Sequence, residues 1–227
     1  MDIFNKILYE FEIFGIEIQI TQTLVSTWVL MGLLIVFALI AKSAVSKFQT
    51  IPTGFQNAVE SLIELVENFV RNTAGENLME LAPWFLMLVL FIFTSNISGI
   101  VGLRPPTTEW STNFALALCS FYFIQKMGIK HRKKDYLKSL VQPIFLFLPI
   151  NIIGELSKPI SLSFRLFGNM LSGLILMAMV YSMPVYLRIL IPIPLHMYFD
   201  LAIGALQTYI FCLLSLSFIR NAAISAS

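Results

Sequence analysis

Charged residues are scarce in this chain. Only 12% of its 227 residues are Asp, Glu, Lys or Arg, whereas a soluble domain carries about 25%, so the water-soluble classes are excluded. Cysteine and histidine are scarcer still, with two of each. Cys119 and Cys212 lie inside apolar runs, and His131 and His196 are far apart, so neither a disulfide framework nor a metal site is expected. Glycine-rich phosphate loops and the HExxH and GxSxG motifs are missing too, so we expect no cofactor and no independent hydrolase.

Apolar residues are what the chain has in abundance: they make up 57% of it and give a mean hydropathy of +0.81. A helix needs about 20 such residues in succession to cross the hydrocarbon core of a bilayer. The apolar runs therefore predict an all-α polytopic membrane protein, a single membrane domain with about five membrane helices and one amphipathic surface helix. The expected segments are an amphipathic lead-in (1–22), a first span (23–41), an interfacial helix (55–73), a second span (83–103), a third span (112–128), a short membrane segment (140–153) and two long helices (155–182 and 194–220).

Basic residues gather in one loop, which runs from Lys130 to Lys134. Loops this rich in lysine and arginine stay on the cytoplasmic side of a membrane. Lys42 and Lys47 follow the first span, two crossings earlier, and would share that side. The sequence thus predicts an amino terminus outside the cell and a carboxyl terminus in the cytoplasm.

One arginine lies far from either end of a predicted long helix. At mid-membrane, Arg165 would cost about 2.5–3.5 kcal/mol on insertion scales, and its guanidinium stays charged at any ordinary pH. Snorkelling to the headgroups is the ordinary explanation for such a residue. However, Ser161 and Asn169 lie one turn to either side and extend a polar stripe that suits close approach by water or another helix. Ionisable residues inside a membrane usually mark an ion pathway, which makes Arg165 the first candidate site residue.

The last helix carries a matching polar stripe. Asp200 and Gln207 are two turns apart on one face, and His196 lies one turn before Asp200. Taken alone, a His-Asp pair near a helix end is more often a solvated terminus than a functional device. Glu155 would lie toward one membrane face, and Glu109, which follows a Pro-Pro turn, toward the other. Acids near both surfaces with a fixed cation between them suggest two aqueous inlets that do not connect.

Residues Ser157–Met170, with the sequence SKPISLSFRLFGNM, resemble the signature of subunit a of the F-type ATP synthases. Gln207 with the following Tyr209-Ile210-Phe211 is similar to that family's second sequence block, and the likeness covers most of the chain. The resemblance implies a stator subunit of a rotary motor, whose two long helices lie steeply tilted against a ring of c subunits. Protons or sodium ions would enter by one half-channel, ride the ring carboxylates, and leave by the other, which couples ion transport to ATP synthesis.

The resemblance also implies partners and residue roles. Besides the c-ring, the partners would be the peripheral-stalk b subunits and the rest of the complex, in the plasma membrane of a bacterium or an organelle inner membrane. The chain itself would have no nucleotide site. Arg165 matches the arginine that would hold a passing carboxylate ionised and block leakage between the half-channels. The other implied ion-pathway positions are Asn169 and Gln207 beside the arginine, Glu155 on the cytoplasmic side, and Asp200 and Glu109 on the outer side.

One departure from the family pattern concerns Leu174, where some members carry an acid. If that acid relays ions in those members, Asp200 must serve alone here, or with water. Two other functions remain open from the sequence. A secondary transporter could bind an anion at Arg165, although such carriers often show repeated halves and this chain shows none. A purely structural membrane scaffold would leave the cost of burying Arg165 unexplained.

Overall fold

The computed structural model describes residues 7–13, 16–45, 54–133, 136 and 147–224. In these ranges the chain is mostly helical, and its one sheet is the antiparallel hairpin of β1 (Ile7–Ile13) and β2 (Ile16–Thr21). The fold class is therefore confirmed as all-α and polytopic. Four helical stretches in the described part are long and apolar enough to cross a membrane: Gln22–Ala44, Glu76–Ile97, Leu148–Tyr181 and Val185–Ala223.

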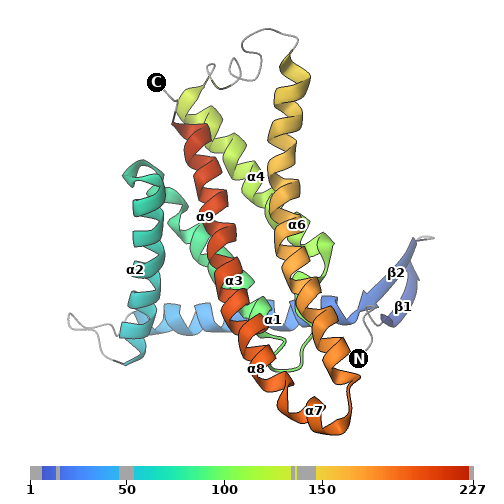
Figure 1. Ribbon diagram of the computed structural model, residues 1–227. Helices are drawn as coiled ribbons and strands as arrows, with labels where there is room; N and C mark the ends of the chain where they lie inside the picture. Colours follow the sequence, from blue (N-terminus) through green and yellow to red (C-terminus); the bar gives the residue numbers. More distant parts are fainter. Residues whose placement is uncertain (1–6, 14–15, 46–53, 134–135, 137–146, 225–227) are drawn as a thin grey trace.

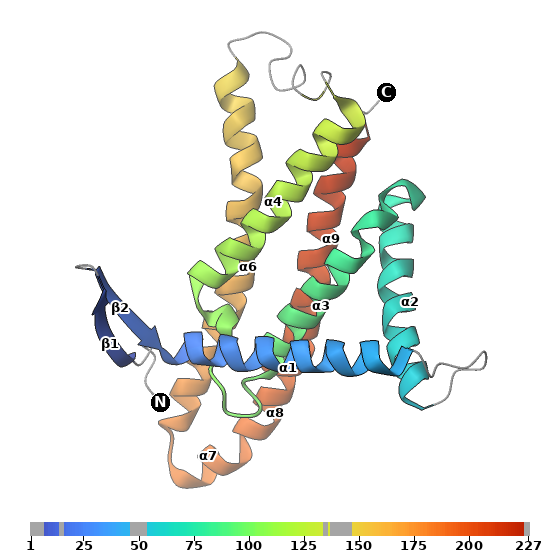
Figure 2. The ribbon, with the colours of Figure 1, turned by 180° about the vertical axis from the view of Figure 1, so that it is seen from behind.

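Helix α1 (Gln22–Val45) lies across the other long helices, as Figures 1 and 2 show from opposite sides. Its 24 residues reach about 36 Å at 1.5 Å per residue, enough to cross the hydrocarbon core. Most of its apolar side chains, such as Trp28 and Leu33, are exposed. A helix that is apolar all round and little buried by its own chain is suited to contact with lipid or another subunit.

Helix α2 (Phe55–Ala74) is amphipathic and lies beside the far end of α1, across its direction (Figure 1). It buries Val59, Val66 and Val70 against the body of the protein and leaves Glu64 and Glu67 exposed. Buried residues spaced three, four and seven apart form one helical stripe, which is why this segment packs along one side only.

The core lies where helices α3 (Ala82–Ile97), α4 (Trp110–Arg132), α6 (Leu148–Tyr181) and α9 (Gly204–Ala223) meet. The 3₁₀ turns Glu76–Leu81 and Pro106–Thr108 lead into α3 and α4. Fully buried apolar side chains fill the contact, and large members from the four helices are Phe85, Ile92, Ile124, Leu166, Phe211 and Leu216.

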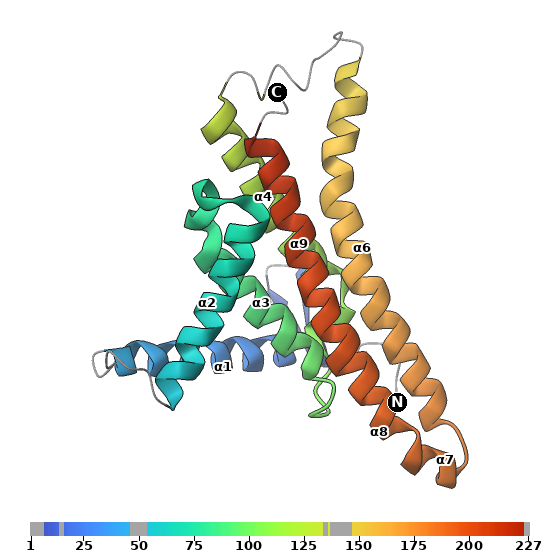
Figure 3. The ribbon, with the colours of Figure 1, turned by 60° about the vertical axis from the view of Figure 1, so that its left-hand side comes forward.

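Helices α6 and α9 are joined at one end through α7 (Val185–Leu190) and α8 (Pro192–His196), and they diverge toward the other end (Figures 1 and 3). A π-helical stretch, Met197–Ile203, continues α8 directly into α9. Wide π turns inside helices often occur at functional sites because they change which side chains share a face.

Several expected boundaries need correction. Residues 148–153 do not form a separate short membrane segment; they are the first turns of α6, and 140–146 lie outside the described residues. Helix α3, which corresponds to the expected second span, ends at Ile97, six residues before the expected end at residue 103. The described part of the lead-in forms the β1–β2 hairpin. Helix α4 covers the expected third span but is not among the four stretches apolar enough to cross, so its crossing stays a prediction.

Candidate functional site

Arg165 lies on an exposed face of α6, although the helix around it is apolar. Ser161 and Asn169 share that exposure, one turn to either side, whereas Leu162 and Leu166 on the adjacent face are buried in the core. No residue in the described part of the chain forms a hydrogen bond or ion pair with the Arg165 guanidinium. Among the described residues, this permanent cation on an outward-facing surface is therefore left without a counter-charge.

Asn169 and Gln207 join the two long helices one turn away from Arg165. The Asn169 Nδ2 donates to the Gln207 Oε1 at 2.5 Å. Gln207 is only 1% exposed, and its own Nε2 is buried without a hydrogen-bond partner among the described residues. The sequence placed both residues near the arginine, and the structure brings them together as the polar crosslink between α6 and α9.

A second polar contact fixes α9 against α3. The Asn96 Nδ2 donates to the backbone oxygen of Gly204 at 3.0 Å, and the Thr107 hydroxyl donates to the Asn96 Oδ1 at 2.9 Å. Asn113 in turn donates to the Thr107 backbone oxygen at 2.7 Å. Thr107 and Asn113 in this network were not predicted. Amide side chains within apolar helices are the sequence signal for such buried contacts.

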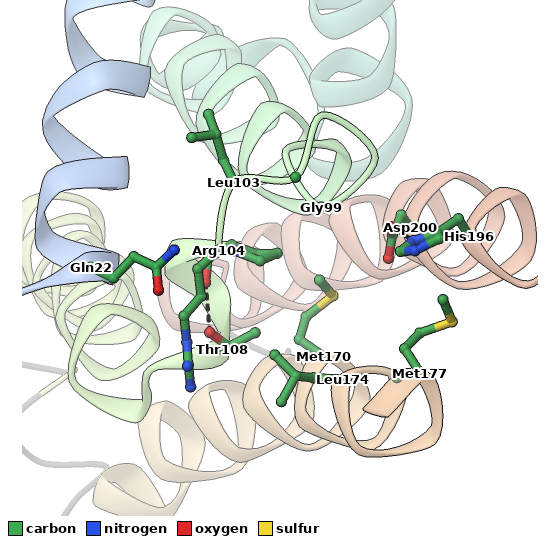
Figure 4. A pocket seen from close by; sticks show the side chains of 13 residues that line it. Gln22, Gly99, Leu103, Arg104, Thr108, Met170, Leu174, Met177, His196 and Asp200 are labelled. Carbon is green, nitrogen blue, oxygen red and sulfur yellow. Dashed lines mark hydrogen bonds and ion pairs between the residues drawn. The ribbon is translucent and has the colours of Figure 1, made fainter. Parts of the chain in front are cut away.

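A cavity of about 180 Å³ lies at the Asp200 end of the long helices. Its polar side chains are Asp200, His196, Gln22, Arg104 and Thr108, of which the last three were not predicted (Figure 4). The α6 wall is formed by Met170, Gly173, Leu174 and Met177, so the cavity follows that helix to the residue next to Asn169.

His196 and Asp200 act as a pair at this cavity. The His196 Nδ1 lies 2.6 Å from the Asp200 Oδ2, and the two side chains are only 23% and 13% exposed. Asp200 also packs against Gly99, where an added Cβ would lie 2.8 Å from its Oδ2. Leu174 lines the same space, so the place of the acid found in some family members faces Asp200 across the cavity.

Glu109 keeps its expected outer-side role as a prediction. It lies just before α4, and its Oε1 accepts a hydrogen bond from the Thr23 hydroxyl at 3.3 Å. It is not among the residues that line the Asp200 cavity. Its visible contact is with the start of α1, which ties that helix to the body of the protein.

Glu155 and Lys158 form the polar cluster at the opposite end of α6. Their ion pair is 2.5 Å long, and the Gln125 Nε2 approaches the second Glu155 oxygen at 3.5 Å. Tyr136 donates to the Gln125 Oε1 at 2.9 Å. Burial, helped by the Glu155 charge, raises the pKa of the Tyr136 phenol, so this side chain stays a neutral donor.

The two clusters are therefore held at opposite ends of α6, with Arg165 between them. In the described ranges, no three His, Cys, Asp or Glu side chains are close enough to hold a metal ion. Acids lie at the two ends and amides near the middle, and the guanidinium has no partner among the described residues; carboxylates attract cations and a guanidinium repels them.

Comparison with known proteins is consistent with this geometry. Residues 24–220 match the family described as "ATP synthase A chain". The chain is 34% identical to ATP synthase subunit a of Trichlorobacter lovleyi over 205 residues, which cover 88% of this chain and 86% of the relative. It is 34% identical to ATP synthase subunit a of Geobacter sulfurreducens, over 86% of this chain and 84% of the relative. It is 32% identical to ATP synthase subunit a of Moorella thermoacetica, over 92% of this chain and 94% of the relative.

Proposed function

The chain belongs to the ATP synthase A chain family, and from that premise we propose that it forms two half-channels for protons or sodium ions. The half-channels would deliver ions to, and collect them from, the carboxylates of a c-subunit ring that turns beside α6 and α9. Movement of one charge across about 100 mV supplies about 2.3 kcal/mol, and several such charges per turn drive ATP synthesis.

The observation that carries this proposal is the bare guanidinium of Arg165. Leaving a charge without a partner in an apolar setting costs several kcal/mol, so a chain keeps it only where something outside supplies the counter-charge. A ring carboxylate that passes α6 is such a counter-charge, and Arg165 favours its ionised form. The carboxylate would therefore release its ion as it reaches Arg165.

The polar clusters supply the two half-channels. The cavity with His196 and Asp200 would be the outer inlet, and the Glu155–Lys158 cluster with Gln125 the cytoplasmic one. Arg165 lies between them and repels any cation that would pass directly from one to the other. The coupling between ion flow and rotation depends on that block.

The arrangement of helices supports a membrane placement. With α1 along the membrane normal, α6 and α9 lie steeply tilted and α2 lies along one membrane surface (Figure 2). We place the amino terminus outside and the carboxyl terminus in the cytoplasm of a bacterial cell, because Lys42 and the basic end of α4 then share the cytoplasmic side. The exposed side of α1 is available to the peripheral-stalk b subunits or to lipid.

The test is ATP-driven acidification of inverted membrane vesicles that carry the assembled complex. We expect Arg165→Ala to abolish pumping, and the matched control Arg188→Ala, on exposed helix α7, to leave it intact. ATP-driven sodium uptake is measured in the same vesicles, because sodium is the alternative coupling ion. Normal pumping by an Arg165→Ala complex that keeps its c and b subunits would refute the proposal, and uptake of a small anion lost on the same substitution would favour a transporter instead.

A further inference from the structure

Three hydrogen-bonded side chains lie at the end where α6 meets α8. The Tyr181 hydroxyl is 3.0 Å from the His196 Nε2, and the His196 Nδ1 is 2.6 Å from the Asp200 Oδ2. Tyr181 is the last residue of α6, His196 the last of α8, and Asp200 lies in the π-helical stretch. The imidazole thus lies between a phenol from one long helix and a carboxylate from the other.

With Asp200 ionised and His196 neutral, the direction of both hydrogen bonds follows. A carboxylate only accepts, so the His196 Nδ1 must carry the proton that it shares with Asp200. In the neutral imidazole the Nε2 is then an acceptor, and the Tyr181 hydroxyl must donate to it. Without that hydroxyl the Nε2 side of the ring loses its partner, and the ring could turn away from Asp200.

Tyr181 acts through the imidazole and has no direct access to the cavity. His196 and Asp200 line the cavity, but Tyr181 is not among its lining residues. The α6 wall opposite the pair is apolar at Met177 and Leu174, and the other charged side chain that lines the cavity is Arg104. The outer pathway therefore depends on the His196–Asp200 pair, and the orientation of that pair depends on Tyr181.

Building on the proposed function, we propose that Tyr181 is a positioning residue of the outer half-channel. It holds the His196 ring in the orientation in which the Nδ1 proton faces Asp200, and so keeps the pair ready to take up protons from the outer side. Asp200 thus does not act alone in place of the acid missing at Leu174. The imidazole one turn before it supplies the second group, and a phenol from α6 sets its geometry.

The experiment uses the assembled complex in proteoliposomes with its soluble part outward, so that the lumen corresponds to the outer side. ATP synthesis is measured while the lumen pH is varied and the external pH is held constant. We expect Tyr181→Phe to raise the half-saturating lumen proton concentration about 2- to 10-fold, the factor carried by one hydrogen bond, with the maximal rate retained. Tyr186→Phe is the matched control, since that phenol is 89% exposed on α7.

A double variant separates positioning from general packing. In a His196→Asn background the acceptor Nε2 is gone, so Tyr181→Phe should cause no further change in half-saturation. Additive effects in the double variant, or an unchanged half-saturation in Tyr181→Phe, would overturn the inference. Synthesis that depends on lumen sodium and not on lumen pH would overturn it too, because no proton would then pass the imidazole. The proposed function is tested separately, since it fails only if Arg165→Ala still couples.

Discussion

Gly204 is a position where one added methyl group should separate two helices. Its backbone has φ −59° and ψ −44°, so alanine fits the local conformation and would by itself favour the helix by about 0.8–1.0 kcal/mol. An alanine Cβ, however, would lie 2.9 Å from the Asn96 Cβ. Carbon atoms pack best at about 3.5–4.0 Å, and both atoms are fixed to their backbones, so α9 and α3 must move apart.

The expected loss of folding stability is the sum of two costs less one gain. Overpacking a tight contact costs about 1–3 kcal/mol, and stretching the hydrogen bond from Asn96 to the Gly204 oxygen adds about 0.5–1.5 kcal/mol. Subtracting the helix preference of alanine leaves a net destabilisation of about 2 kcal/mol. For a chain of this size that lowers the melting midpoint by about 4–8 °C.

The assay is thermal unfolding of the purified complex in mild detergent, followed by the loss of folded chain on heating. Gly32→Ala is the matched control, because that glycine is exposed on α1 and an added Cβ meets no atom within 4 Å. We expect the control to melt at or slightly above the wild-type temperature. The packing argument is wrong if Gly204→Ala melts as high as Gly32→Ala.

Two further predictions concern contacts near the ion pathway. Gly99→Ala places a Cβ 2.8 Å from the Asp200 Oδ2 and should displace that carboxylate, so we expect slower ATP-driven pumping by a complex that assembles normally; unchanged pumping would show that the carboxylate position is not critical. Asn169→Leu leaves the buried Gln207 amide without its partner and should cost about 1–3 kcal/mol in thermal unfolding. Adding Gln207→Leu should restore the thermal stability, because no buried amide is then left without a hydrogen-bond partner. It should not restore pumping, because the hydrogen bond between α6 and α9 is still missing. Recovery of both stability and pumping would assign the pair a purely structural role.

Hydrophobic length predicted the long helices well because crossing a bilayer demands about 20 apolar residues whatever the tertiary contacts are. The false break within α6 arose where Gly154 and Glu155 interrupt an apolar run. In the structure Glu155 is paired with Lys158, so its charge does not force the helix to end. Polar residues inside a membrane helix are tolerated when a neighbour on the same face satisfies them.

The amino-terminal hairpin shows a different limit. Apolar and acidic residues alternate there, and a period of two is the pattern of a strand, so the segment expected as an amphipathic lead-in pairs as two strands. The register pairs Glu10 with Gln19, which also hydrogen-bond through their side chains. Such pairing joins residues across a turn and is not visible from the composition of either strand.

Parts of the candidate site were accessible from the sequence and others were not. Helical spacing places Asn169 one turn from Arg165 and Gln207 two turns from Asp200, whereas the position of Gln207 beside the arginine was implied only by the family resemblance. The hydrogen bond from Tyr181 to His196 joins residues from different helices, and only the path of the chain through α7 brings them together. The π-helical stretch that carries Asp200 has no spacing signal of its own.

The sparse packing of α1 has a consequence for the order in which the protein is made. Its buried side chains, Thr23, Ser26 and Leu30, lie in its first half, and Thr23 bonds to Glu109, 86 residues further along the chain. At about 5–20 residues per second, Thr23 is added about 4–17 s before that acid exists. Because so little of α1 is buried by the rest of the chain, we expect α1 to enter the membrane without its later contacts, and the later helices to pack against it.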